Sequence, residues 1–182
     1  IDIGSINFNN NEGKSINHLF LNSCGIGFDA LSAYYSNQKS RLKGLPLYLK
    51  AVTKSLRSYF PSEMSIVIDK KIEIKGKKIM ISIGNGKTSG GGFYLTPQAE
   101  IDDGKLDIAI AEHVGLIKIL SLLPRAINGK YINSIHMKYH KLEDAIIQIQ
   151  PGNYLHTDGE IISTNADNLE VSILKSALKV LR

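Results

Sequence analysis

The chain has 182 residues, of which 43% are hydrophobic and 21% charged, a balance typical of one globular domain with its own core. No run approaches the roughly 20 apolar residues of a membrane span and no signal-peptide pattern is present, so the sequence predicts a soluble protein. The single cysteine, Cys24, excludes an internal disulfide and favours the cytoplasm.

The first half of the chain combines strand patterns with one clear helix. It opens at Ile1 on "IDIGSINF", which resembles the middle of a strand, so we expect a fragment of a longer polypeptide. Alternating apolar residues predict strands over 18–23, 64–69 and 78–84. Between them, apolar residues at helical spacing predict a helix from about Leu45 to Phe60, stopped by Pro61 and preceded by a turn or two over 29–37.

The second half continues the strand pattern. Strands are predicted over 105–112, 132–143, 145–150 and 169–175, with turns near 69, 75, 151 and 158. A second helix is predicted over 115–128, kinked or shortened by Pro124 and ended by a left-handed Gly129. The fold class is therefore mainly β with a few helices, an antiparallel β-sandwich-like domain rather than an alternating βαβ sheet.

The formal net charge of +5 is concentrated in two stretches that lack carboxylates. One lies between Glu112 and Glu143 and the other between Asp29 and Glu63; their cations are Lys118, Arg125, Lys130, Lys138 and Lys141, and Lys39, Arg41, Lys43, Lys50, Lys54 and Arg57. Such stretches attract the phosphates of nucleotides, nucleic acids or anionic lipid surfaces. The alternative is that they are ordinary solvated faces of helices and strands.

Two glycine-rich stretches invite a nucleotide-binding interpretation. "NGKTSGGGFYLTP" (85–97) is not a P-loop, because Ile81 stands where the first glycine of that motif belongs. Its consecutive glycines still suit an anion-binding turn, or only a pliable loop between strands. "NSCGIGFDA" (22–30) loosely fits a dinucleotide pattern, but no carboxylate follows Asp29 until Glu63, which argues against a dinucleotide site.

Two acidic stretches carry candidate chemistry. "AEIDDGKLDIAI" (99–110) offers the oxygen ligands that Mg²⁺ or Ca²⁺ prefers, although the stretch taken alone favours a simple acidic turn leading into a strand. "HTDGEII" (156–162) predicts a hairpin with a type I′ turn at Asp-Gly. Alternatively, Asp158 and Glu160 lie at the rim of a sheet, where one of them accepts a proton from an alcohol.

In this order, "NSCGIGFDA", "NGKTSGGGFYLTPQAEIDDGKLDIAI" and "HTDGE" resemble the C-terminal half of the diacylglycerol kinase catalytic family, particularly the soluble bacterial lipid kinases and their sphingosine kinase-like relatives. The resemblance covers nearly the whole chain. It implies the β-sandwich-like second domain of the NAD kinase/diacylglycerol kinase-like fold. The family's Gly-Gly-Asp-Gly-Thr signature, which holds ATP in an N-terminal domain, is absent from these residues.

The resemblance also implies roles for individual residues. Glu160 matches the proton acceptor toward the lipid hydroxyl, with Asp158 beside it. Asp103 matches the aspartate that binds a structural Mg²⁺ together with backbone oxygens at Glu100 and Lys105, whereas a separate Mg²⁺ accompanies ATP. The turn between the strands would face the cleft and contact the nucleotide or acceptor through Asn85, Thr88, Gly90, Gly91 and Gly92.

The leading hypothesis is therefore the C-terminal domain of an ATP-dependent lipid kinase, inactive by itself, whose partners are ATP, Mg²⁺, its own N-terminal domain and a lipid at the membrane surface rather than a nucleic acid. We expect a cytoplasmic, peripherally membrane-associated protein, and exposed edge strands permit a homo-oligomer. The alternatives are a small-molecule kinase domain related to NAD kinase, and a non-catalytic β-domain that binds anionic lipid or a protein.

Overall fold

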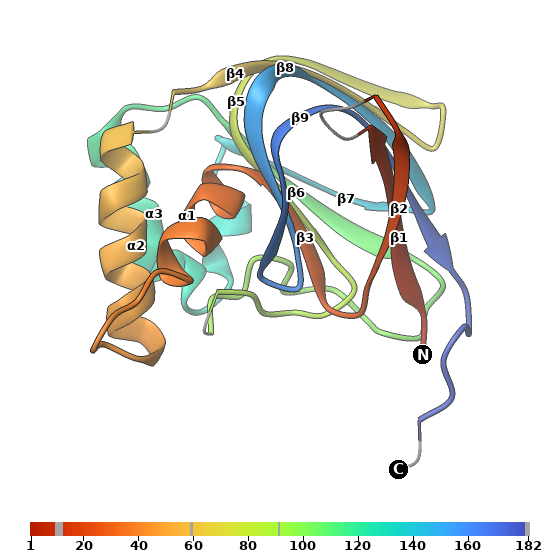
Figure 1. The fold of residues 1–182 in the computed structure, drawn as a ribbon, viewed down its shortest axis with the longest axis horizontal. Helices are drawn as coiled ribbons and strands as arrows, with labels where there is room; N and C mark the ends of the chain where they lie inside the picture. The colour runs from red at the N-terminus through yellow and green to blue at the C-terminus, as the bar shows by residue number, and fades with distance from the viewer. Residues whose placement is uncertain (10–12, 59, 91, 181–182) are drawn as a thin grey trace.

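The computed structural model describes residues 1–9, 13–58, 60–90 and 92–180 (Figure 1). Its strands are β1 (Ile3–Asn9), β2 (Ser15–Phe20), β3 (Ser23–Gly27), β4 (Ser62–Ile68), β5 (Ile72–Gly84), β6 (Leu106–Glu112), β7 (Met137–Leu142), β8 (Asp144–Thr157) and β9 (Glu160–Leu174). Its helices are α1 (Phe28–Ser36), α2 (Gly44–Ser58), α3 (Leu116–Ala126) and the short 3₁₀ helix η1 (Lys130–Asn133). The predicted class, mainly β with a few helices, is confirmed.

The described strands form one antiparallel sheet in the order β2-β1-β9-β8-β3-β5-β6-β7. Along one edge, the long strands β5 and β8 each pair with two strands, because β4 pairs with the first parts of both and β3 pairs with their last parts. β4 and β3 therefore lie end to end between β5 and β8. The sheet curls around an enclosed face (Figure 1). This topology brings the C-terminal ends of β5 and β8 to the two sides of β3.

Two apolar cores result from this arrangement. The larger lies inside the curled sheet and is built mainly from isoleucine and leucine, including Ile26, Ile81 and Leu155, which are fully buried. The smaller lies between the sheet and the three α-helices, which gather on one side of it (Figure 1). Helix α2 faces this second core with Tyr48, Ala51, Val52 and Ser55, the spacing of one helical face.

Most predicted elements are confirmed and four details are wrong. The single strand expected over 18–23 is instead the end of β2, a bend at Leu21 and Asn22, and the first residue of β3. The expected strand over 132–143 begins only at Met137, because the left-handed Gly129 starts η1 and Tyr131 is buried in the helical layer, with its hydroxyl donating to the carbonyl of Leu95. The turns expected near 75 and 151 are also absent: β5 runs through Gly76, and β8 runs through Pro151 with shifts in its pairing to β9. Both strands keep partners on either side of these residues, which overrides the local turn preference.

Within the described residues, no helix is both long and apolar enough to span a bilayer.

Candidate functional site

The turn between β8 and β9 is a two-residue hairpin. Asp158 (φ 50°) and Gly159 (φ 87°) both adopt positive φ, and Thr157 pairs with Glu160 across the turn. These are the features of the predicted type I′ turn, so the predicted hairpin is confirmed. Glu160 is exposed at the first position of β9.

The carboxylate of Asp158 binds the backbone of the turn between β2 and β3, which is distant in the sequence. It accepts hydrogen bonds from the backbone N–H groups of Leu21, Asn22 and Ser23 at 2.8, 2.9 and 2.8 Å. The Asp158 N–H in turn donates to the carbonyl of Ser23 at 2.7 Å. These bonds fix the β8–β9 hairpin to the turn between β2 and β3, which gives Asp158 a positioning role in the fold.

A polar cavity lies beside this hairpin. Five segments surround it: the β2–β3 turn, helix α1, the start of α2, the glycine turn after β5 and the β8–β9 hairpin. The lining residues are Asn22, Ser23, Asp29, Ala33, Ser36, Asn37, Gly44, Leu47, Tyr48, Ser89, Gly90, His156, Asp158 and Gly159. Segments from most of the chain thus meet at one cavity.

The glycine turn contributes backbone to the wall of the polar cavity. Gly90 (φ 57°) packs against Tyr48 of α2 so closely that a Cβ at this position would lie 2.3 Å from the ring. Gly92 also has a positive φ of 117°, which favours glycine, and Gly91 falls outside the described residues. A glycine at position 90 therefore permits the close approach of the turn to α2.

Asn85 and Thr88, predicted as contacts of the same turn, bond to the protein itself. The Asn85 side chain is buried and its amide donates to the carbonyls of Asp2 and Leu21, both at 2.9 Å, while its carbonyl oxygen lacks a partner. The carbonyl of Thr88 accepts from the Asn22 side chain at 3.0 Å. Neither residue lines the polar cavity.

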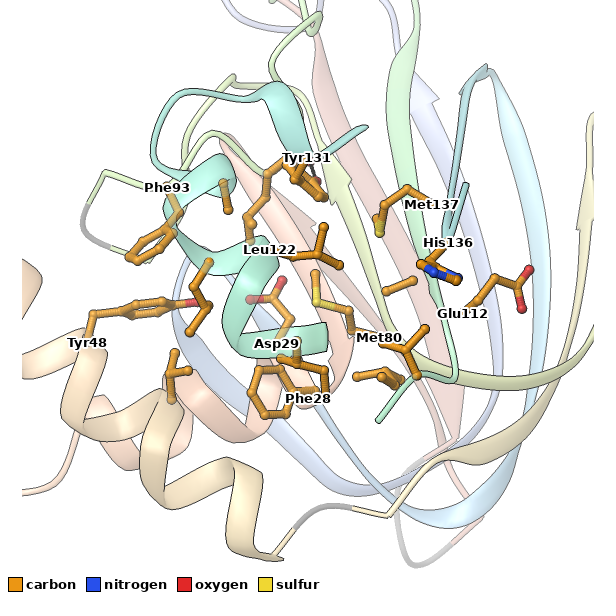
Figure 2. Close-up of a pocket in the computed structure, with 18 residues that line it drawn as sticks. Phe28, Asp29, Tyr48, Met80, Phe93, Glu112, Leu122, Tyr131, His136 and Met137 are labelled. Carbon is orange, nitrogen blue, oxygen red and sulfur yellow. Dashed lines mark hydrogen bonds between the residues drawn. The ribbon is translucent and has the colours of Figure 1, made fainter. Parts of the chain in front are cut away.

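An apolar cavity lies on the other side of α1 and shares Asp29 and Tyr48 with the polar cavity. Its remaining lining is almost entirely hydrophobic and includes Phe28, Met80, Phe93, Leu122 and Met137. Figure 2 shows the Asp29 carboxylate and the Tyr48 hydroxyl directed into this cavity. Asp29 and Tyr48 are therefore part of the walls of both cavities.

The phenol of Tyr48 stays protonated at this junction. Burial raises its pKa well above the ordinary value, and the negative charge of Asp29 raises the pKa further. Burial, with Asp29 as the second cause, likewise raises the pKa of the Cys24 thiol. Cys24 is therefore a buried neutral thiol and not a nucleophile.

In the acidic turn after the glycine segment, Asp103 forms an ion pair with Lys141. Asp103 accepts from the Lys141 ammonium at 2.5 Å and from the backbone N–H of Lys105 at 3.0 Å. Glu100 and Lys105 have exposed side chains. Nearby, Asp107 is fully buried, and burial raises its pKa, although the Tyr139 hydroxyl and the charge of Lys141 oppose part of this rise.

Among the described residues, no group of three histidine, cysteine or carboxylate side chains is arranged to hold a metal. The buried carboxylate of Asp107 would suit a divalent cation, but the Lys141 ammonium lies 4.0 Å from one of its oxygens and bonds Asp103 directly. A cation at this turn would therefore displace Lys141. The structural Mg²⁺ at Glu100, Asp103 and Lys105 stays a prediction.

Sequence reasoning gave no role to Asp29, His156 or Tyr48, all of which line the polar cavity. The available signal was positional, because Asp29 and His156 lie within "NSCGIGFDA" and "HTDGE", the stretches that carry the family resemblance.

Comparison with known proteins identifies relatives. A family model described as "YegS C-terminal NAD kinase beta sandwich-like domain" matches residues 22–182. A diacylglycerol kinase of Mycobacterium tuberculosis (strain CDC 1551 / Oshkosh) is 28% identical over 182 residues, which cover 100% of this chain and 57% of that protein. The chain thus spans little more than half the length of this relative.

Solved structures agree on the fold. A diacylglycerol kinase from Bacillus anthracis str. Sterne matches with a TM-score of 0.57 at 17% identity, covering 96% of this chain and 50% of that one. Yeast NADH kinase complexed with NADH matches with a TM-score of 0.52 at 12% identity, covering 95% of this chain and 40% of that one. At these identities the likeness concerns the fold alone.

Proposed function

Because the chain belongs to the family of YegS C-terminal NAD kinase β-sandwich-like domains, we propose that it is the C-terminal domain of an ATP-dependent lipid kinase. The reaction would transfer the γ-phosphate of ATP to the hydroxyl of a lipid alcohol such as diacylglycerol. An N-terminal domain would supply the Gly-Gly-Asp-Gly-Thr segment that holds ATP, so the 182-residue chain is inactive by itself. The name of the M. tuberculosis relative, a diacylglycerol kinase, supports this proposal.

The observation that carries the proposal is the junction of the two cavities at Asp29 and Tyr48. A lipid alcohol has the same two-part character, with a small polar headgroup attached to long apolar chains. The carbons next to its headgroup would enter the apolar cavity, and its hydroxyl would lie in the polar cavity beside the β8–β9 hairpin. Apolar pockets with a few convergent polar groups are the usual form of small-molecule sites.

Within this proposal Glu160 acts as the general base and Asp158 as a positioning residue. Phosphoryl transfer depends on holding the acceptor oxygen in line with the γ-phosphate of ATP. The Mg²⁺ that accompanies ATP would neutralise charge on the phosphates. Glu160 is exposed beside Gly159, a lining residue of the polar cavity, and is free to accept the proton of an approaching hydroxyl. Asp158 would hold the hairpin through its bonds to the β2–β3 turn.

The test of this assignment is Glu160→Gln in the complete polypeptide, with Glu170→Gln on the same strand as the control. A general base contributes about 10²- to 10⁴-fold, so turnover of a lipid alcohol should fall by that factor while Glu170→Gln stays at the wild-type rate. Both variants should melt at the wild-type temperature because both side chains are exposed. Unchanged turnover in Glu160→Gln would refute its role as base.

The helical side of the domain is the proposed membrane-docking face. Ile117 of α3 is 87% exposed and Ile135 is 91% exposed, although α3 lines the apolar cavity with other side chains. Lys118, Arg125 and Lys130 are exposed in the same part of the chain. Each cation near an anionic leaflet is worth about 1 kcal/mol, and exposed isoleucines would insert among the lipids.

Vesicle sedimentation tests this face. Binding to vesicles containing phosphatidylglycerol should weaken as salt rises and should drop in Ile117→Asp and Ile135→Asp. Ile72→Asp, which replaces a 40% exposed isoleucine on β5, serves as the control and should bind as the wild type does. Binding that is insensitive to salt, or equal loss in all three variants, would contradict this docking face.

A further inference from the structure

Within the part of the chain that the structure describes, two buried polar atoms of residues that line the polar cavity have no hydrogen-bond partner. They are Oδ2 of Asp29 and Nε2 of His156, in side chains that are 3% and 1% exposed. The two atoms are 3.5 Å apart, beyond the 2.7–3.2 Å range of an ordinary N–H···O bond. Because leaving buried polar atoms unpaired is unfavourable, this pair suits a guest that pairs with both.

The hydrogen bond to the other ring nitrogen defines what His156 offers. The backbone N–H of Gly159 donates to Nδ1 at 3.2 Å, so in the neutral imidazole the proton resides on Nε2. The cavity therefore presents one donor, His156 Nε2–H, beside one acceptor, Asp29 Oδ2. A hydroxyl group satisfies both, since it accepts from the imidazole and donates to the carboxylate, whereas an ester or carbonyl oxygen only accepts.

A glycine allows these two atoms to approach each other over β3. Gly25 of β3 is the cross-strand partner of His156 in β8. A Cβ at position 25 would lie 2.3 Å from His156 Nε2 and 2.4 Å from Asp29 Oδ2. Any side chain at this position would therefore crowd the two atoms and displace a bound group.

The position of Asp29 relates this pair to the acceptor lipid, given the proposed lipid kinase function. Asp29 lines both cavities, so a lipid with its chain in the apolar cavity and its headgroup in the polar cavity would pass the pair at the headgroup. We propose that Asp29 and His156 bind a second, non-reacting hydroxyl of the acceptor. The preferred substrates are then lipids with two neighbouring hydroxyls in the headgroup, rather than diacylglycerol, whose neighbouring position is an ester.

The test compares two acceptors in the complete polypeptide with ATP and Mg²⁺. 1-Monooleoylglycerol and 3-hydroxypropyl oleate share the acyl chain and the terminal hydroxyl, and only the former has the middle hydroxyl. Sites built to bond a substrate hydroxyl reject the analogue that lacks it by large factors, so kcat/KM should favour monooleoylglycerol by roughly 100-fold or more. Equal kcat/KM values would overturn this inference and leave the kinase proposal standing; phosphorylation of neither acceptor, nor of diacylglycerol, would overturn both.

Two substitutions test whether Asp29 and the space at position 25 produce the preference for an acceptor with a second hydroxyl. Asp29→Leu removes the acceptor, and Gly25→Ala adds a methyl group that crowds both atoms, so each should bring the ratio of the two kcat/KM values close to one. The control is Asp167→Leu on β9, whose carboxylate accepts a hydrogen bond from the neighbouring Asn168 N–H and does not line either cavity, and it should keep the wild-type ratio. A wild-type ratio in Asp29→Leu would refute the assignment; if that variant does not fold, the two acceptors with the wild-type protein still decide.

Discussion

The bonds of Asp158 to the β2–β3 turn can be tested by Asp158→Gly. Glycine adopts the positive φ of position 158 without strain, so this change removes the carboxylate and preserves the type I′ turn. Of the three amides that lose their acceptor, those of Leu21 and Asn22 are exposed to solvent and can bond to water, whereas that of Ser23 is partly buried. A bond to a charged group is worth about 1.5–3 kcal/mol when water does not replace it, so we expect a total loss of about 3 kcal/mol.

For a domain of this size such a loss lowers the melting temperature by roughly 6–12 °C. Thermal unfolding of the chain followed by circular dichroism measures it. The matched control is Lys70→Gly in the β4–β5 turn, which also replaces a residue of positive φ (55°) but removes no carboxylate. Its melting temperature should stay close to that of the wild type. If Asp158→Gly melted within 2 °C of the control, the bonds of Asp158 would not hold the hairpin in place.

Three further predictions concern buried charges and the acidic turn. Glu112→Ala should destabilise the fold by about 3–5 kcal/mol in chemical denaturation, because it leaves the buried Lys78 ammonium without its carboxylate at 2.6 Å, whereas Lys78→Met should cost much less. Asp107→Asn should raise the melting temperature at pH 7 more than at pH 4. Because the pKa of Asp107 is raised in the folded state, the folded protein keeps the carboxyl proton at pH values where the unfolded chain has lost it. The stability of the wild type therefore falls as the pH rises from the unfolded-state pKa of this group through its folded-state pKa. If the acidic turn binds a metal, a chelator should lower the melting temperature of the wild type but not of Asp103→Ala; equal melting with and without chelator would exclude a structural metal there.

The strand and helix pattern could be predicted from the sequence because local rules govern it. The apolar face of α2 follows helical spacing, and the Asp-Gly turn at 158 requires two positive φ values that these residues readily adopt. The strand expected over 132–143 was wrong in its first part for a non-local reason. Tyr131 is drawn into the core beneath α3 and bonds to Leu95, a contact that alternation along the chain does not encode.

The glycine-rich turn illustrates the same limit within the site. Its glycines predicted a backbone that approaches another group closely, and Gly90 does so, but the group is the ring of Tyr48 from α2. The amide of Asn85, expected to face a ligand, instead joins the ends of β1 and β2 through the carbonyls of Asp2 and Leu21. Composition thus indicated the kind of backbone required and not the partner that it meets.

The pairing register of the sheet explains why Asp29 and His156 escaped sequence reasoning. They are far apart in the chain, and each alone is an ordinary residue at a strand end or helix start. They meet because β3 pairs with β8 so that Gly25 lies opposite His156, and because α1 begins directly after β3 and turns Asp29 back over Gly25. A slip of one residue would move His156 to the other face of the sheet. The close approach of the two side chains therefore depends on this one register and on glycine at position 25. The proposed preference for a second hydroxyl depends on the same two features.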